Sequence, residues 1–225
     1  MSTPRVVSLV PSATETLLAW GVEPVACTRF CEQPGLRHVG GTKDPDLGAI
    51  VDLAPDLVVV DEEENRREDA DALTDAGLVL HVLAVRDLIH LDQQMGGLAD
   101  AVGATWEPLG PIGEPPLIRT AYVPIWKRPW MALGEPTYGS AVLRALGIAN
   151  VAADDKGAYP QLDPDEAGRR GSDIVVAPSE PYPFAERHRP LLAPAGPVVF
   201  VDGRDLLWWG ARTRAALARL ADVLR

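Results

Sequence analysis

Short runs of apolar, β-branched residues alternate along the chain with longer amphipathic segments. In the first part of the chain, the runs that predict buried strands are 6–10, 25–27, 56–60 and 78–82. The segments between them predict helices, namely one that follows Pro11-Ser12 and ends before Gly21, one over 46–53, and an acidic one over 62–76 that ends at Gly77. Strands that alternate with helices form parallel βαβ units, so we expect a small Rossmann-like sheet here.

The second part of the chain repeats this order. The matching segments are a strand over 130–133, a helix over 138–146, and strands over 173–176 and 198–201. The tripeptide Arg-Asp-Leu occurs at 86–88 and again at 204–206, each time at nearly the same distance from a preceding Asp-Leu/Ile-Val-Val run. Long helices are predicted over 88–102 and 213–224. Matched elements in one order predict two duplicated lobes.

The predicted join between the lobes is the helix over 88–102 and a loop with prolines at 108, 111, 115 and 116. The predicted fold class is therefore α/β, with two Rossmann-like lobes of parallel sheet joined by a single long bridging helix. The expected boundaries are 1–85 for the N-terminal lobe, 86–103 for the bridging helix, and 104–225 for the proline-rich connector and C-terminal lobe. A single helix should limit closure of the lobes to a small rocking motion.

Charge and hydropathy bear on whether the protein binds nucleic acid or a membrane, and on where it is located. The formal net charge of −11 argues against nucleic acid and against an anionic membrane surface. No run of 18 apolar residues is present, so membrane insertion is not expected. Met1–Pro4 leads directly into the first predicted strand without a basic, hydrophobic leader. We therefore expect a cytoplasmic protein, or a periplasmic or extracellular one if a leader was removed.

Ligands of open parallel sheets bind beyond the carboxyl ends of the strands. The loops predicted there in the second lobe are rich in aromatic residues, and a loop of the first lobe carries Lys43. The aromatic candidates for ligand contact are Trp126, Trp130, Tyr182, Phe184, Trp208 and Trp209. Aromatic loops that face one cleft suit a large, flat or conjugated ligand, with few polar groups to orient it.

The motifs of common catalytic sites are missing from the sequence. It contains no Gly-x-Ser-x-Gly, no phosphate-binding Gly-Lys-Ser/Thr loop, no His-Glu-x-x-His and no Cys-x-x-Cys. We expect no catalytic residues, no metal ligands and no cofactor. Two alternatives stay open. Cys27, Cys31 and His38 could hold a metal instead of being ordinary loop residues, and the acidic run 62–64 could bind a cation instead of favouring a helix N-terminus.

Four segments in this order resemble the helical-backbone metal receptor family. They are Arg5-Val6-Val7-Ser8-Leu9-Val10-Pro11-Ser12-Ala13-Thr14-Glu15, Val39-Gly40-Gly41-Thr42-Lys43, Ala54-Pro55-Asp56-Leu57-Val58-Val59 and Tyr159-Pro160-Gln161. The family comprises the substrate-binding proteins of ABC importers for vitamin B12, haem and iron–siderophores. The resemblance covers nearly the whole chain and implies the class III periplasmic-binding-protein-like architecture, two lobes and one bridging helix.

The resemblance also implies site residues and partners. It places Phe30, Cys31, Asn65, Tyr138 and Tyr159 at cleft positions. It implies a small-molecule ligand, namely cobalamin or another corrinoid, haem or a ferric siderophore. It further implies an ABC transporter permease as a partner, which Asp165 would help to dock.

Our leading hypothesis is a binding protein, not an enzyme, that holds a corrinoid, haem or metal chelate in a cleft between the lobes, as in ABC-importer substrate-binding proteins. Two alternatives differ in class. One is a cytoplasmic sensor or chaperone of the same fold without a transporter. The other is a metal-dependent enzyme that uses the cleft.

Overall fold

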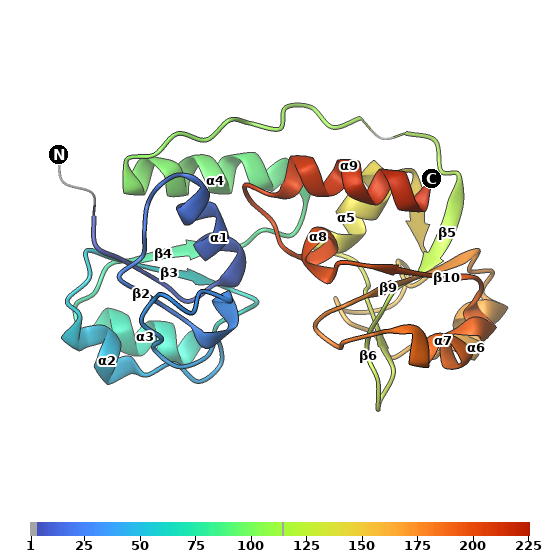
Figure 1. Cartoon of the computed structure of the whole chain (residues 1–225), viewed down its shortest axis with the longest axis horizontal. Coiled ribbons are helices and arrows are strands. Elements are labelled where there is room, and N and C mark those ends of the chain that lie inside the picture. The colour runs from blue at the N-terminus through green and yellow to red at the C-terminus, as the bar shows by residue number, and fades with distance from the viewer. Residues whose placement is uncertain (1–3, 114) are drawn as a thin grey trace. The chain divides into compact units, whose positions relative to one another are not determined.

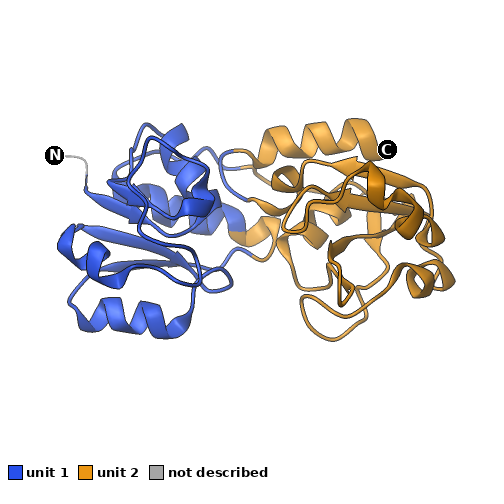
Figure 2. Cartoon of the chain, turned by 60° about the horizontal axis from the view of Figure 1, so that its bottom comes forward, with its two compact units in different colours: residues 1–85, 91–108, 209–211 blue, residues 86–90, 109–208, 212–225 orange. Residues whose placement is uncertain are grey.

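The computed structural model describes residues 4–113 and 115–225, and within these ranges the chain forms two compact units (Figure 2). Unit 1 consists of residues 1–85, 91–108 and 209–211, and unit 2 of residues 86–90, 109–208 and 212–225. Helix α4 (Leu88–Val102) therefore contributes residues to both units. The lobe boundaries expected from the sequence stay predictions.

Unit 1 is built on a parallel sheet with the strand order β2-β1-β3-β4 (Figure 1). The strands are β1 (Val6–Ser8), β2 (Ala26–Cys27), β3 (Leu57–Asp61) and β4 (Leu80–Leu83). Every residue of β1 and β3 is buried, because these two strands lie in the middle of the sheet. The strands follow the apolar runs of the sequence, as expected for a parallel sheet covered on both faces.

The helical segments of unit 1 are α1 (Pro11–Ala19), the 3₁₀ turn η1 (Arg29–Cys31), α2 (Leu47–Asp52), α3 (Arg67–Asp75) and most of α4. Leu91, Met95, Leu98 and Val102 are buried and recur at helical spacing, so α4 packs through one apolar face. Ile50 and Leu73 join β1 and β3 in a common core. No helix among residues 4–113 and 115–225 is long and apolar enough to cross a membrane.

Unit 2 is built on a second parallel sheet, in the order β10-β9-β5-β8, with a separate antiparallel pair. The sheet strands are β5 (Arg119–Tyr122), β8 (Ile148–Asn150), β9 (Ile174–Pro178) and β10 (Val198–Val201), and the pair is β6 (Pro124–Trp126) with β7 (Met131–Ala132). In chain order within each unit, both sheets place the second strand, the first, the third and the fourth side by side. The shared topology confirms the predicted fold of two parallel-sheet lobes.

The helical segments of unit 2 lie mostly in the last third of the chain. They are α5 (Tyr138–Ala145), α6 (Pro164–Arg169), η2 (Glu186–His188), α7 (Arg189–Leu192), η3 (Ala193–Ala195), α8 (Gly203–Leu207) and α9 (Thr213–Leu224). Helix α8 packs against α9 and against α5. Thr137 accepts a hydrogen bond from the Ser140 amide and so caps α5.

The structure corrects the match between the two repeats. The segment 130–133 was expected to correspond to the first strand of unit 1, but it forms β7 in the antiparallel pair. The counterpart of β1 is β5, which pairs with both β8 and β9. Strand β5 follows directly on the proline-rich connector and begins with Arg119 and Thr120, so no apolar run marks its start. The β6–β7 hairpin is thus inserted between the first strand and the first helix of the repeat.

Two predicted helix starts are also wrong. Helix α1 begins at Pro11, whose fixed φ suits a first helical position, instead of after Pro11-Ser12, so both of these residues lie inside the helix. Helix α3 begins at Arg67 instead of residue 62. The Asp61 carboxylate accepts hydrogen bonds from the amides of Glu63 and Glu64, which holds the acidic run in a turn before the helix. The acidic run therefore does not serve as a helix N-terminus.

Candidate functional site: the carboxyl edges of the two sheets

In unit 2, three loops leave the carboxyl ends of adjacent strands. The β6–β7 hairpin follows β5, residues 179–185 follow β9, and Asp202 with α8 follows β10. Because β5, β9 and β10 are neighbours and parallel, these loops gather at one edge of the sheet. That edge is where open parallel sheets hold their ligands.

The hairpin and the loop after β9 build an aromatic cluster, which consists of Trp126, Trp130, Tyr182, Phe184 and His188. Phe184 is buried in the core of unit 2, and Trp130 stacks on it with an angle of 5° between the rings. Tyr182 lies 4.7 Å from Phe184 between ring centroids, and Trp126 meets Tyr182 edge-on at 5.6 Å. Trp126 is 43% exposed, so the cluster runs from the core to an aromatic surface.

His188 belongs to the same cluster, because its ring meets Tyr182 and Phe184 edge-on. The Ala185 amide donates a hydrogen bond to His188 Nδ1 at 3.1 Å, which requires that nitrogen to be unprotonated. Burial lowers the pKa of His188, and the positive charges of Arg187 and Lys127 lower it further. The aromatic cluster therefore has a neutral histidine inside and cationic side chains at its rim, although the chain as a whole is acidic.

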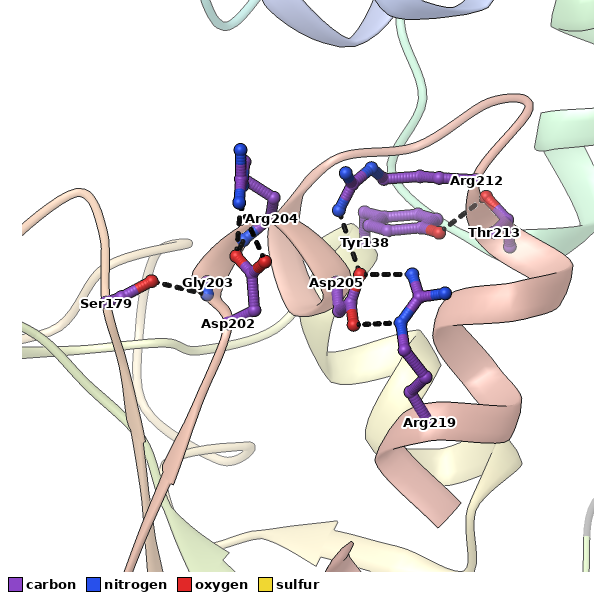
Figure 3. Close-up of polar contacts among 9 residues, drawn as sticks. All are labelled: Tyr138, Ser179, Asp202, Gly203, Arg204, Asp205, Arg212, Thr213 and Arg219. Atoms are coloured by element: carbon purple, nitrogen blue, oxygen red, sulfur yellow. Dashed lines mark hydrogen bonds and ion pairs between the residues drawn. The ribbon is translucent and has the colours of Figure 1, made fainter. Parts of the chain in front are cut away.

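The loops after β9 and β10 are fastened to each other beside this cluster. The Gly203 amide donates to Ser179 Oγ at 3.0 Å (Figure 3). A Cβ at Gly203 would lie 2.7 Å from the Glu180 backbone nitrogen. Only glycine allows this approach. The Asp202 carboxylate accepts from the Arg204 amide and pairs with its guanidinium at 3.0 Å. The start of α8 is thus fixed against the end of β9.

Two of the predicted contact residues in this region, Tyr138 and Trp208, contact side chains at the start of α9. Tyr138 is buried, shares a 2.8 Å hydrogen bond with the Thr213 hydroxyl, and has its pKa raised by burial (Figure 3). The guanidinium carbon of Arg212 lies 5.5 Å from the Trp208 ring centroid, while the same side chain donates to Asp205 at 2.8 Å. These contacts order the start of α9 next to α8.

At the carboxyl edge of unit 1, the 3₁₀ turn η1 follows β2 and presents Phe30, which is 50% exposed. The guanidinium carbon of Arg29 lies 4.7 Å from the Phe30 ring centroid. Arg29 is itself fixed by both carboxylate oxygens of Asp44, at 2.9 and 3.0 Å. This edge therefore also offers an exposed aromatic ring with a cation against it.

The other predicted contact residues of unit 1 form hydrogen bonds with neighbouring segments. Asn65 is buried, accepts from the Asp61 amide at 2.8 Å, and donates to the Thr42 carbonyl at 3.0 Å. Lys43 donates to the Glu63 carbonyl at 2.5 Å. Cys31 is buried and accepts a hydrogen bond from the Thr14 hydroxyl at 3.2 Å. These contacts tie the loops at the edge to one another.

Exposure separates the twelve predicted contact residues. The large apolar side chains that remain exposed are Phe30, Trp126 and Tyr159. Those that are buried are Cys31, Asn65, Tyr138, Phe184 and Trp209. Tyr159 lies on a segment that pairs with β7, since the Ala132 amide donates to the Pro160 carbonyl and Gly134 to Ala158. Trp209 belongs to unit 1, unlike Trp208, which belongs to unit 2.

Sequence reasoning missed the cationic and imidazole neighbours of the aromatic rings. Arg29 precedes Phe30, Lys127 follows Trp126, and His188 lies four residues after Phe184. These spacings were available as a signal. In the part of the chain that the structure describes, no three His, Cys, Asp or Glu side chains gather as metal ligands, so Cys27, Cys31 and His38 form no such site.

No family model matches the chain, but individual proteins do. The vitamin B12-binding protein of Salmonella paratyphi A is 27% identical over 199 residues, which cover 77% of this chain and 72% of the relative. The periplasmic vitamin B12 binding protein BtuF of Vibrio cholerae superposes with a TM-score of 0.80 at 18% identity, covering 99% of this chain and 96% of that one. The periplasmic haem-binding protein BhuT, solved with two haems, gives a TM-score of 0.79 at 21% identity, with both chains fully covered.

These comparisons correct one expectation and confirm another. The expected cytoplasmic location is wrong, because the similar solved structures are of periplasmic proteins. The resemblance noticed in the sequence is confirmed by the relatives and by the superpositions. The chain is similar in sequence to vitamin B12-binding proteins, and it shares its fold with the periplasmic vitamin B12- and haem-binding proteins BtuF and BhuT.

Proposed function

We propose that this protein is the ligand-binding component of an ABC importer, that it works outside the cytoplasmic membrane, and that it binds a corrinoid, haem or another metal chelate. The observation that carries the proposal is the aromatic cluster at the carboxyl edge of unit 2, with its exposed Trp126 and its cationic rim. The relatives support it, since they are named as binding proteins for vitamin B12 and haem. We also propose that the protein releases its ligand chemically unchanged.

The chemistry of the edge suits a large conjugated ring that carries anionic groups. The exposed side chain of Trp126 offers flat apolar surface at the edge of unit 2, and each aromatic contact contributes roughly 0.5–1.5 kcal/mol beyond the area that it buries. Lys127 and Arg187 supply positive charge beside the aromatic cluster. A haem carries two carboxylates and cobalamin one phosphate, while cobinamide lacks that phosphate. Haem and cobalamin should therefore bind more tightly than cobinamide.

The test measures binding of cyanocobalamin, cobinamide, haem and a ferric siderophore by titration calorimetry and by quenching of tryptophan fluorescence. We expect micromolar or tighter binding of at least one of them, and Trp126→Ala should weaken that binding at least tenfold. Leu191→Ala is the matched control, because Leu191 is an equally exposed apolar side chain of unit 2 on α7. If none of the four binds at micromolar concentration, the proposed ligand class is wrong.

A second variant tests the contribution of the cationic rim separately from that of the aromatic side chains. Lys127→Gln combined with Arg187→Gln should weaken haem binding more than cobinamide binding, and should reduce the loss of haem affinity caused by added salt. Equal effects on both ligands would show that the cationic rim does not contact the ligand. Recovery of the ligand unaltered after prolonged incubation, checked by mass spectrometry, tests the proposal that no reaction is catalysed.

A further inference from the structure

We propose that Cys27 and Cys31 form an intramolecular disulfide under oxidising conditions, and that this bond fastens the turn carrying Phe30 to strand β2. Both thiols are free and buried in the structure. They are the only cysteines of the sequence, so each has one possible intramolecular partner. The proposal does not depend on which ligand the protein binds.

The fold brings the two side chains together. Cys27 ends β2 and is paired with Ser8 of β1, which fixes its backbone. After Thr28 the chain turns back through η1, and the Cys31 amide donates to the Thr28 carbonyl at 3.1 Å. Cys31 Sγ lies 3.2 Å from the hydroxyl of Thr28, the residue that follows Cys27, so the turn brings the Cys31 side chain back beside the end of β2. A disulfide requires a Cα separation of about 4.4–6.8 Å, which such a turn can supply although a regular helix seldom does.

The surroundings make the two sulfurs chemically unequal. The interaction with Cys27 and the hydroxyls of Thr14 and Thr28 together lower the pKa of Cys31 to about 6, although burial acts in the opposite direction. The interaction with Cys31, together with burial, raises the pKa of Cys27. Cys31 is therefore the nucleophile, because the thiolate is the form that attacks a disulfide.

The oxidant is a low-molecular-weight disulfide such as glutathione disulfide, or the disulfide of a thiol oxidase. The Cys31 thiolate attacks it, forms a mixed disulfide and releases one thiol. Cys27 then loses its proton to solvent, attacks Cys31 Sγ and displaces the second thiol. The protein gives up two electrons and two protons, and the oxidant is reduced to two thiols. The periplasm is a compartment in which such bonds form and persist.

The bond would act directly on the exposed edge of unit 1. Arg29 and Phe30 lie between the two cysteines, and Arg29 is held by Asp44 in the next loop. A cross-link from Cys27 to Cys31 therefore closes a ring around the residues that present the Phe30 side chain.

The test uses the full chain, equilibrated in buffers of varied ratio of reduced to oxidised glutathione, both folded and in concentrated guanidinium. Samples are quenched with an alkylating agent under denaturing conditions and weighed by mass spectrometry. We expect the folded protein to lose two hydrogens and take up no alkyl group. It should form the bond at a reduced-to-oxidised ratio at least tenfold higher than the denatured chain does.

Two outcomes would overturn the proposal. One is that both thiols of the folded protein are alkylated in the most oxidising buffer, even when it is refolded there. The other is that the folded and denatured chains oxidise at the same ratio, because the fold would then contribute nothing to the pairing. Cys27→Ser and Cys31→Ser are the controls, and each should carry one glutathione or one alkyl group. A disulfide-linked dimer of the wild type on a non-reducing gel would also contradict an intramolecular bond.

Discussion

A buried carboxylate joins the last two helices of unit 2, α8 and α9. Asp205 is buried and accepts hydrogen bonds from Arg212 at 2.8 Å and from Arg219 at 2.7 and 2.6 Å (Figure 3). Arg212 is itself mostly buried, with 13% of its side chain exposed. One carboxylate of α8 thus balances two guanidinium groups at α9, so this polar contact joins neighbouring helices at the carboxyl edge.

Asp205→Asn should lower the free energy of unfolding by roughly 3 kcal/mol, because it removes the negative charge that balances a buried guanidinium. Urea denaturation followed by circular dichroism measures the change. Asp202→Asn is the control, since Asp202 pairs with Arg204 at an exposed position and should cost under about 1 kcal/mol. Equal effects of the two substitutions would contradict the importance of burial.

His188 should make the stability of the protein depend on pH. Its folded-state pKa lies below the ordinary value of 6.5, so the unfolded chain binds the proton more readily. Its contribution to stability is complete above about pH 6.5 and decreases as the pH falls from there towards the folded-state pKa. His188→Gln should therefore flatten the curve of unfolding free energy between pH 7 and pH 5.

The same measurement distinguishes His188 from the other perturbed histidine. Burial also lowers the pKa of His81, which lies on β4. The slope that remains in His188→Gln should decrease further when His81→Gln is added. An unchanged slope in the first variant would show that His188 is not the group that titrates.

At the scale of elements, the β6–β7 hairpin depends on a close backbone approach. The Gly134 amide donates to the Ala158 carbonyl at 2.8 Å, just beyond the end of β7. A Cβ at Gly134 would lie 2.7 Å from Pro160 Cδ and 2.8 Å from the Gly157 carbonyl oxygen. The segment that carries Tyr159 is therefore fitted against a position that admits only glycine.

Gly134→Ala should destabilise the protein by about 1–3 kcal/mol, because the added methyl group forces the two segments apart. Hydrogen exchange should become faster at Ala132 and Gly134, whose amides donate to this segment. Gly96→Ala, in the middle of α4, is the control. A Cβ there meets nothing within 4 Å, and alanine should stabilise the helix by up to about 1 kcal/mol.

The elements differ in how well the sequence predicts them. Strands β3 and β9 follow long apolar runs, and α4, α5 and α9 were predicted within one residue because their periodicity and the glycines after α4 and α5 are clear. Strand β8 is only three residues long and follows Gly147 directly, so it carries too little pattern. The sequence identifies the aromatic residues of the loops as candidates for ligand contact, but it does not show which of them are buried and which are exposed. Phe184 is buried in the core of unit 2 with Trp130 stacked on it, whereas Trp126 at the end of β6 is exposed.

At the scale of the whole molecule, the chain does not divide at one point. Residues 209–211 belong to unit 1, although they come after nearly all of unit 2. Trp209 is buried, and the Ala211 amide donates to the Thr16 hydroxyl of α1 at 3.1 Å. The packing of unit 1 is thus completed by a segment from near the C-terminus.

Gly210→Ala should loosen α1 in unit 1 and lower stability by about 2 kcal/mol or more. Gly210 has a φ of +106°, and a Cβ there would overlap the Thr16 hydroxyl. Gly77→Ala is the control, because Gly77 also has positive φ (+84°) but no atom within 4 Å of the added Cβ, so it reports the backbone strain alone. Hydrogen exchange of the α1 amides measures the local effect, and equal protection in both variants would contradict it.

The placement of residues 209–211 has a consequence for biosynthesis. A ribosome adds residues from the N-terminus onward, and domains generally fold in that order. Here the packing surface of α1 remains incomplete until residue 211 has left the ribosome. Unit 1 therefore acquires its last native contacts only at the end of synthesis, so α1 should be less protected in the nascent chain than in the finished protein.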